Sequence, residues 1–370
     1  MKILLLPFLN ISSGHHQAAD ALMTSIGDVH SCSSCKKVDI LQYSYQMIEP
    51  LVSAAYLKWI GFFPGSYSWI YRNLAYRRKT DHYYLYEAIF LKFMERLLIE
   101  EQPDYIFCTH SLPSYLLNRL KSVNSLHAPT VNVYTDYFIN DIWGIRHADY
   151  HFVPDWHFKQ YLMDKGVPEK RILITGIPIH PHIQRSEQAK KIKSTFPLNL
   201  LISGGSLGSG EILKLIGNLR LSGYIRYWVL CGKNLELYDT LSQMNHPLLR
   251  AFPYIRSRSD MNQLYDLADG IVAKPGGVTM SEAISKKLPI FIFHALPGQE
   301  EFNLQHLRSL GLVFLLKRET DIEQQILSVL LNKSVRENWN QRIDAYERKI
   351  TDKNLALTLQ RLFSNSSNDQ

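Results

Sequence analysis

Cysteine is scarce in this chain, with four among 370 residues. Four cysteines are too few for the disulfide framework of a small secreted protein. Cys108 and Cys231 each follow an apolar run, which predicts that both are buried in strands. Cys32 and Cys35 form one C-x-x-C beside His30. Because a zinc site usually needs a second pair, we interpret this stretch as a reduced, solvated loop, with a redox pair as the alternative.

Long hydrophobic runs and a strong charge of either sign are also lacking. No apolar stretch reaches the ~20 residues of a membrane-spanning helix, and the short apolar start is broken by Pro7, so we expect a cytoplasmic protein without a signal peptide. The apolar fraction of 46% excludes a disordered chain, a coiled coil and a collagen-like fibre. The net charge of +7 favours an anionic partner, whether nucleotide, nucleic acid or lipid.

Short apolar runs alternate with longer amphipathic segments, which predicts an α/β fold with parallel sheets and helices on both faces. Two such series predict two Rossmann-like domains facing a cleft, as the length also suggests. The predicted strands are 3–6, 37–40, 105–108, 130–134 and 150–153, then 199–203, 225–231, 270–273 and 289–293. The predicted helices include 17–26, 84–100, 209–221, 260–268 and 279–286.

A proline-rich segment separates the two series. Ile-Pro-Ile-His-Pro at 177–181 cannot continue a helix or a central strand, and a polar, basic stretch follows it. We therefore predict an N-terminal domain over 1–178, a linker over 178–197 and a C-terminal domain over 197–370, with the last helix packed back on the first domain. Each domain starts with a strand and a turn of small residues, and we expect both turns at the carboxyl edge of a sheet, where ligands bind.

The segment 274–282, Lys-Pro-Gly-Gly-Val-Thr-Met-Ser-Glu, carries the strongest chemical signal. Gly276 and Gly277 let a ligand approach the backbone, and free amides at a helix start attract an anion. Thr279 can donate to a phosphate, and Glu282 can accept from ribose hydroxyls. The simpler interpretation is a capped strand–turn–helix, but the neighbouring motifs favour an anion site.

Those neighbouring motifs also follow predicted strands. The Gly/Ser turn at 204–210 suits a diphosphate, and Cys-Gly-Lys-Asn at 231–234 ends a strand at the same edge. Gln299, Glu300 and Asn303 begin a later helix, where they can bind sugar hydroxyls or simply cap the helix. Each of these signals is weak alone.

In this order, the motifs resemble the family of monogalactosyl- and glucosyl-diacylglycerol synthases, which belong with the lipid-intermediate GlcNAc transferase of peptidoglycan synthesis. In the first half, Gly-His-His-Gln-Ala-Ala at 14–19, Tyr-Thr-Asp-Tyr at 134–137 and Ile-Thr-Gly-Ile-Pro-Ile at 174–179 are similar to the family's motifs. The resemblance covers residues 1–315. It departs from the family pattern at Ser12, at Asn140-Asp141, where a histidine is common, and at Ser206-Leu207. If the family's histidine at that position helps to bind the acceptor, we expect the acceptor of this protein to differ from the family's usual one.

The resemblance implies a GT-B fold and an inverting transfer of a hexose from a UDP-sugar to a lipid acceptor, above all diacylglycerol. A polar or cell-wall acceptor is the alternative. The resemblance places the diphosphate on the amides at 276–279, the ribose on Glu282, the sugar on Gln299 and Glu300, and the uracil near Ile255. The implied donor-binding residues are Gly14, Gly205, Ser206, Asn234, Ile255, Gly276, Gly277, Val278, Thr279, Glu282, Gln299 and Glu300.

Such a displacement needs a base for the acceptor proton and a group that stabilises the leaving diphosphate. His15 is the first candidate base, since a histidine titrates at about 6.5. Alternatively, His15 or His16 caps the first helix or touches the phosphates. Asp136 is the second candidate, with orienting a histidine as its alternative role. The chain has no Asp-x-Asp, so we expect no metal and no cofactor besides the donor substrate.

Residues 56–79 combine many aromatic and basic side chains with no acidic one. This mixture is typical of an anionic membrane surface, so we predict peripheral binding to the inner face of the cell membrane near the acceptor entrance. Stacking on a nucleic acid and burial in the core are the alternatives. The predicted membrane and acceptor residues are Trp59, Phe62, Phe63, Trp69, Arg72, Arg77 and Arg78.

Two other functional classes remain open. Asp39, at the end of the second predicted strand, imitates the ribose acid of an NAD-dependent oxidoreductase, but the first turn lacks G-x-G-x-x-G. A non-catalytic nucleic-acid or membrane-binding module would not use the donor-like motifs, and +7 is a small charge for binding nucleic acid. We expect a UDP-sugar, a lipid acceptor and an anionic membrane as partners, and no nucleic acid.

Overall fold

The computed structural model describes most of the chain, and the structural findings concern those residues alone. The described ranges are 1–8, 13–29, 34–44, 84–187, 195–208, 211–296 and 298–366. Cys32, Ser12 and the entire segment 56–79, with its predicted membrane residues, lie outside them. The chain divides into two compact units: unit 1 is Met1–His180 with Lys349–Gln370, and unit 2 is Pro181–Arg348. The division lies inside the range 178–197 that the sequence marked as a linker.

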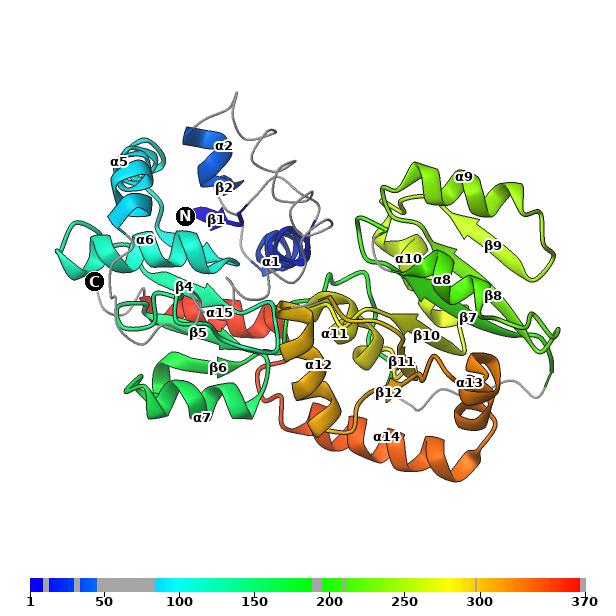
Figure 1. Cartoon of the computed structure of the whole chain (residues 1–370). Coiled ribbons are helices and arrows are strands. Elements are labelled where there is room, and N and C mark those ends of the chain that lie inside the picture. Colours follow the sequence, from blue (N-terminus) through cyan, green and yellow to red (C-terminus); the bar gives the residue numbers. More distant parts are fainter. Residues whose placement is uncertain are drawn as a thin grey trace. The chain divides into compact units, whose positions relative to one another are not determined.

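Unit 1 is built on a six-stranded parallel sheet in the order β2-β1-β3-β4-β5-β6 (Figure 1). Its inner strands β1, β3 and β4 are almost entirely buried, as helices on both sides of a parallel sheet require, and only β4 includes polar residues, Thr130 and Asn132, within the buried part. The strands are β1 (Lys2–Leu6), β2 (Ser34–Lys37), β3 (Tyr105–Cys108), β4 (Thr130–Val133), β5 (Tyr150–Val153) and β6 (Ile172–Ile174). The helices are α1 (Gly14–Val29), α2 (Ile40–Ser44), α5 (Tyr84–Glu101), α6 (Ser111–Ser122), α7 (Trp156–Asp164) and α15 (Leu355–Ser366), with a 3-10 turn at Glu169–Arg171.

The C-terminal helix α15, red in Figure 1, completes the core of unit 1. Its side chains Leu359, Leu362 and Phe363 join the same buried cluster as Leu22 and Ile26 of α1. The hydroxyl of Tyr105, on β3, donates to the backbone oxygen of Leu362 over 3.2 Å. The last residues of the chain therefore stabilise the unit that contains the first ones.

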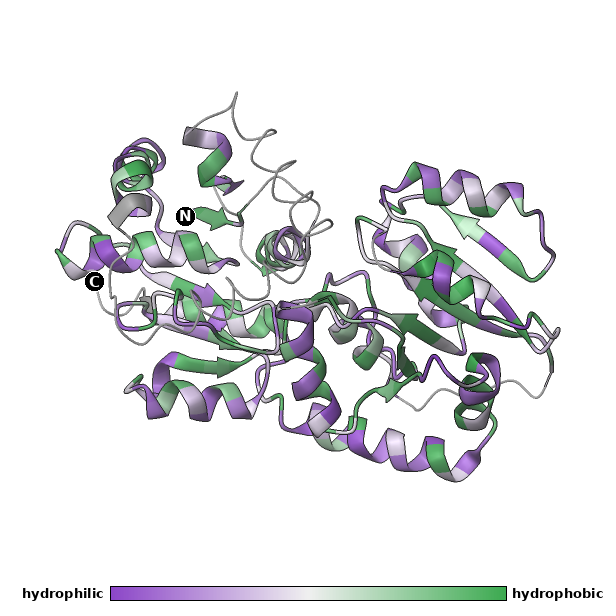
Figure 2. Ribbon diagram, viewed as in Figure 1, coloured by the Kyte–Doolittle hydropathy of each residue, from purple (hydrophilic) through white to green (hydrophobic). Residues whose placement is uncertain are grey.

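Unit 2 is a second six-stranded parallel sheet, in the order β12-β11-β10-β7-β8-β9. Figure 2 shows the same pattern in both units, with apolar strands enclosed by helices whose outer faces are hydrophilic. The strands are β7 (Leu198–Ser203), β8 (Ile225–Leu230), β9 (Leu249–Phe252), β10 (Gly270–Ala273), β11 (Ile290–Ile292) and β12 (Phe314–Leu315). The helices are α8 (Ile212–Gly217), α9 (Leu235–Gln243), α10 (Arg258–Leu267), α11 (Gly277–Ser285), α12 (Gln299–Ser309), α13 (Ile322–Leu330) and α14 (Lys333–Arg348).

Both sheets have one topological switch point. In unit 1 the chain goes from β1 to β2 on one side and then resumes with β3 on the other side of β1. In unit 2, β7 leads to β8 and β9, and β10 then pairs with the opposite side of β7. Ligands of open α/β sheets bind outside the carboxyl ends of the strands at such points. The predicted α/β class with two Rossmann-like sheets is confirmed. The candidate ligand sites are therefore the carboxyl ends of β1 and β3 in unit 1 and of β7 and β10 in unit 2.

The predicted strand 37–40 is wrong in its position. The strand that pairs with β1 is Ser34–Lys37, and Ile40 already begins α2. The side chain of Asp39 instead lies at the start of α2, where its Oδ1 accepts from the amides of Leu41 at 2.8 Å and Gln42 at 3.2 Å. Asp39 thus caps a helix, as aspartate does readily. No helix in the described ranges is long and apolar enough to cross a bilayer.

Candidate functional site

The switch point of unit 1 holds His15, in the first turn of α1. Its Nδ1 lies 2.9 Å from the backbone oxygen of Thr109, after β3, and 2.7 Å from Oγ1 of Thr135, after β4. A carbonyl oxygen can only accept, so in the neutral ring Nδ1 carries the hydrogen. The lone pair is then on Nε2, and His15 is oriented to take up a proton there.

The charge state of His15 is set by opposing influences. Burial lowers the pKa of the imidazole from its ordinary value, while the nearby Asp136 carboxylate and the Thr109 carbonyl raise it. Burial has the largest effect, so the ring is mainly neutral at neutral pH. The two residues predicted as candidate bases are therefore electrostatically coupled, with Asp136 favouring the protonated form of His15.

A second histidine at this edge, His110, was missed by the sequence analysis. It is the N-cap of α6, and its Nδ1 accepts from the amide of Leu112 over 3.1 Å. The ring stacks on Phe8 at a centroid distance of 5.0 Å and meets the ring of His15 edge-on at 4.8 Å. The available signal was its position two residues after a predicted strand, at the edge that already held His15. Gly14, predicted with the donor site, begins α1 beside this group.

In unit 2, the glycine turn after β7 packs tightly on the turn after β8. The amide of Lys233 donates to Ser206 O over 2.9 Å, and Gly208 N donates to Gly205 O over 3.0 Å. A Cβ added to Gly208 would lie 1.8 Å from the backbone oxygen of Cys231. The glycines thus serve this close backbone approach. Gly205 also faces Lys274, whose Cε would lie 3.1 Å from an added Cβ, so the first and third donor motifs are neighbours.

Asn234 has structural partners for both ends of its amide group. Its Oδ1 accepts from the amide of Leu237 over 2.9 Å and caps α9, while Nδ2 donates to Gly208 O over 3.4 Å. In this structure the Asn234 side chain links the start of α9 to the glycine turn. Ile255, predicted near the base, is half-buried in the connection between β9 and α10.

The segment after β10 has the geometry of an anion site. Gly276 is the N-cap of α11 in an extended conformation, and Gly277 is the first helical residue. The amides of Gly277, Val278 and Thr279 therefore have no partner within the helix. A Cβ on Gly276 would meet no described atom within 4 Å, so the backbone is approachable there.

Glu282 lies one turn further along α11 and is only 5% exposed. Its Oε2 accepts from the Tyr265 hydroxyl over 2.8 Å. Burial raises the pKa of the carboxyl, whereas Arg258 and the Tyr265 hydrogen bond lower it. Because a carboxylate has two oxygens and can accept from several donors, Glu282 can bind a ribose hydroxyl while it keeps the Tyr265 hydrogen bond.

Glu300 and Asn303 tie the start of α12 to the segment after β10. Glu300 Oε1 lies 2.9 Å from Lys274 Nζ, and its Oε2 accepts from the amide of Leu296 over 2.8 Å. Asn303 is fully buried and donates to Pro275 O over 3.0 Å. Both residues thus hold Lys274 and Pro275 against α12, and Gln299, the first residue of α12, precedes Glu300.

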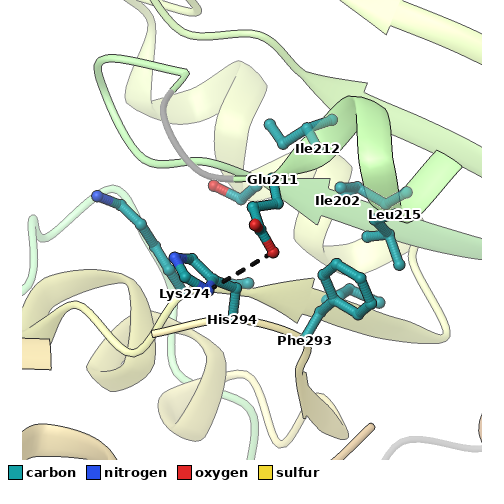
Figure 3. A pocket seen from close by; sticks show the side chains of 10 residues that line it. Ile202, Glu211, Ile212, Leu215, Lys274, Phe293 and His294 are labelled. Atoms are coloured by element: carbon teal, nitrogen blue, oxygen red, sulfur yellow. Dashed lines mark ion pairs between the residues drawn. The ribbon is translucent and has the colours of Figure 1, made fainter. Parts of the chain in front are cut away.

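A pocket lies at the carboxyl ends of β7, β10 and β11 (Figure 3). At its rim the Glu211 carboxylate pairs with Arg318 and lies 3.7 Å from His294 Nδ1. These polar groups carried no sequence signal. The lining residues are Ile202, Ser203, Glu211, Ile212, Leu215, Val272, Ala273, Lys274, Phe293 and His294.

Comparisons with known proteins agree with this geometry. Residues 15–179 match the family described as monogalactosyldiacylglycerol (MGDG) synthase. The chain is 42% identical over 372 residues to "Uncharacterized glycosyltransferase YkoN" of Bacillus subtilis, covering 99% of this chain and 98% of that protein. It is 28% identical over 345 residues to the "Processive diacylglycerol beta-glucosyltransferase" of Bacillus cytotoxicus, covering 89% and 85%. Among solved structures, Acinetobacter baumannii MurG has the same fold, with a TM-score of 0.60, 14% identity and coverage of 99% and 100%.

Proposed function

The chain belongs to the monogalactosyldiacylglycerol synthase family of GT-B glycosyltransferases, and from this premise we propose that it transfers a hexose from a UDP-sugar to diacylglycerol. The class, a glycosyltransferase, follows from the family. The UDP-sugar donor, the lipid acceptor and the roles of individual residues are the proposal. The observation that carries it is the amide-rich start of α11 with Glu282 one turn away, at the switch point of unit 2.

We assign the donor to unit 2 on chemical grounds. The amides of Gly277, Val278 and Thr279, together with the positive end of the α11 dipole, suit a diphosphate. Glu282, held by Tyr265, suits the ribose hydroxyls, and Gln299 and Glu300 would hold the sugar. The same amides would stabilise the negative charge that develops on the leaving UDP.

We assign the acceptor to unit 1. His15 Nε2 would remove the proton of the acceptor hydroxyl as its oxygen bonds to the anomeric carbon. The bond from that carbon to the diphosphate oxygen breaks on the opposite face, so the configuration inverts. Asp136 would favour the imidazolium that forms, because its carboxylate raises the pKa of His15.

A lipid acceptor is proposed because relatives across nearly the whole chain are named as processive diacylglycerol beta-glucosyltransferases. The aromatic and basic residues of 56–79 suit peripheral binding to the inner membrane face, where diacylglycerol is accessible. We propose no metal and no cofactor besides the donor, since the sequence lacks an Asp-x-Asp metal clamp.

The test is incubation with a panel of UDP-sugars and diacylglycerol in anionic vesicles, with mass spectrometry of the lipids. We expect a hexosyl-diacylglycerol product from one donor, and none from His15→Ala protein. Transfer to a soluble cell-wall acceptor without lipid would replace diacylglycerol in the proposal. Absence of UDP release with every donor would overturn it.

A further inference from the structure

The His110 ring beside His15 is fixed in orientation. Nδ1 accepts the Leu112 amide at the start of α6, Phe8 stacks on one face, and His15 abuts the ring. Because Nδ1 is an acceptor, the hydrogen of the neutral ring is on Nε2. In His15 the hydrogen is on Nδ1, so the two neighbouring rings have opposite tautomers. One offers a lone pair at Nε2, and the other offers an N–H there.

The surroundings of His110 oppose a positive charge. Burial, together with His15 and His16 nearby, holds the pKa of this imidazole well below its ordinary value. The position at the positive end of α6 acts in the same direction. The ring therefore stays neutral when His15 takes up a proton, and its Nε2 remains a hydrogen-bond donor throughout turnover.

We propose that His110 is a second functional histidine, whose Nε2–H donates to an oxygen atom of the acceptor while His15 removes the acceptor's proton. The inference rests on the proposed function, because it assigns the acceptor to the β1/β3 edge. A neutral donor suits an uncharged oxygen, such as a hydroxyl or an ester carbonyl. A phosphate would instead favour a protonated ring, which this site disfavours. His110 keeps its proton and forms no bond to the sugar.

The structural alternative is that His110 only caps α6. The two tasks use different ring nitrogens, so two substitutions separate them. In His110→Asn the amide oxygen reaches the place of Nδ1 and keeps the cap, but nothing replaces the Nε2–H. In His110→Gln the longer amide carries an N–H to about the place of Nε2, while the cap is weakened.

The experiment measures kcat/KM for diacylglycerol, KM for the UDP-sugar and the thermal midpoint for wild type and both variants. We expect His110→Asn to lower kcat/KM for diacylglycerol at least about tenfold, as loss of a buried hydrogen bond does, with an unchanged donor KM. Both variants lose the ring contacts to Phe8 and His15, but Asn keeps the cap, so the midpoint of His110→Asn should lie above that of His110→Gln. We expect His110→Gln to stay within about threefold of wild type in kcat/KM despite a lower midpoint, since the neutral hydrogen bond is retained.

Each other outcome contradicts the inference. Normal kcat/KM in His110→Asn, with loss only in His110→Gln, would assign His110 to the cap alone. A higher donor KM in His110→Asn would place the N–H on the donor instead of the acceptor. Wild-type protein run in parallel distinguishes the failures: no hexosyl transfer by wild type overturns the proposed function, whereas transfer unaffected by His110→Asn overturns only the role of His110.

Discussion

At the scale of single residues, the protonation of His15 controls the proposed reaction. Only the neutral ring can accept a proton, so activity falls as the pH drops through the pKa of His15. Burial lowers that pKa, so we expect the acid limb of the kcat/KM profile below about pH 6.5, the ordinary histidine value.

Asp136 provides the test of this assignment. Its carboxylate raises the pKa of His15, so Asp136→Asn lowers that pKa further. We expect the acid limb of the variant to move to lower pH in a series of initial rates at saturating donor. A limb that moves to higher pH, or stays in place, would show that Asp136 does not act on the base.

Glu282 makes a separate prediction about the donor. A hydrogen bond to a charged group is worth about 1.5–3 kcal/mol, so Glu282→Gln should raise the donor KM about 10-fold to 100-fold with little change in acceptor KM. Glu236→Gln, at an exposed glutamate of the same unit, serves as the control and should leave both constants unchanged. A normal donor KM in Glu282→Gln would remove Glu282 from the ribose site.

The sequence predicted those site residues whose structural partners are close to them along the chain. Gly276 and Gly277 lie at a helix start because strand, glycines and helix follow one another along the chain. Sequence reasoning could not foresee that Asn234 bonds to Gly208, or that Glu300 pairs with Lys274, because Gly208 and Lys274 follow other strands of the sheet. The sequence analysis missed His110 for the same reason, because the residue it contacts, His15, is 95 positions away in the chain.

At the scale of elements, continuous apolar runs located the central strands well. β3 and β10 match the predicted ranges 105–108 and 270–273. The strands β6, β9 and β12 were missed: β6 and β12 are apolar but only three and two residues long, and Arg250 interrupts the four residues of β9. β2 was misplaced because its residues Ser-Cys-Lys-Lys carry no apolar signal, and pairing with β1 determines its register.

The glycine turn after β7 gives a prediction for an element. Gly208 has a φ of +59°, and an added Cβ would lie 1.8 Å from Cys231 O, so Gly208→Ala must displace one of the two turns. We expect a loss of about 2–4 kcal/mol in the free energy of unfolding and weaker donor binding, measured by chemical denaturation and UDP titration.

Gly217→Ala is the matched control for this substitution. Gly217 ends α8 in the same unit, and a Cβ there would meet no described atom within 4 Å. Its stability should equal or slightly exceed that of wild type, because alanine favours helix. Equal stability of the two variants would contradict the role given to the turn.

At the scale of the whole molecule, the two Rossmann-like sheets present different chemical groups at their switch points. The edge in unit 1 offers two imidazoles of opposite tautomer, His15 with a lone pair at Nε2 and His110 with an N–H there. The edge in unit 2 offers backbone amides and a buried carboxylate, which suit a diphosphate and a sugar. The strand orders of the two sheets differ, but each sheet has a switch point, between β1 and β3 in unit 1 and between β7 and β10 in unit 2, where the turns after its strands can meet a ligand.

Membrane binding is a prediction about the whole protein. Each basic residue near an anionic surface contributes about 1 kcal/mol, so replacing Arg77 and Arg78 by Gln should weaken partition onto anionic vesicles about 30-fold. Co-sedimentation measures this, and added salt should weaken wild-type binding as well. The control is Lys170→Gln with Lys333→Gln, which removes equal charge at exposed sites. Equal losses in both double variants would point to net charge instead of this segment.

The most direct measurement is a crystal structure of the protein with UDP. We expect the diphosphate on the amides of Gly277, Val278 and Thr279, and the ribose hydroxyls on the Glu282 carboxylate. UDP bound at the His15 turn of unit 1, or a complex whose phosphates lie away from α11, would contradict the account.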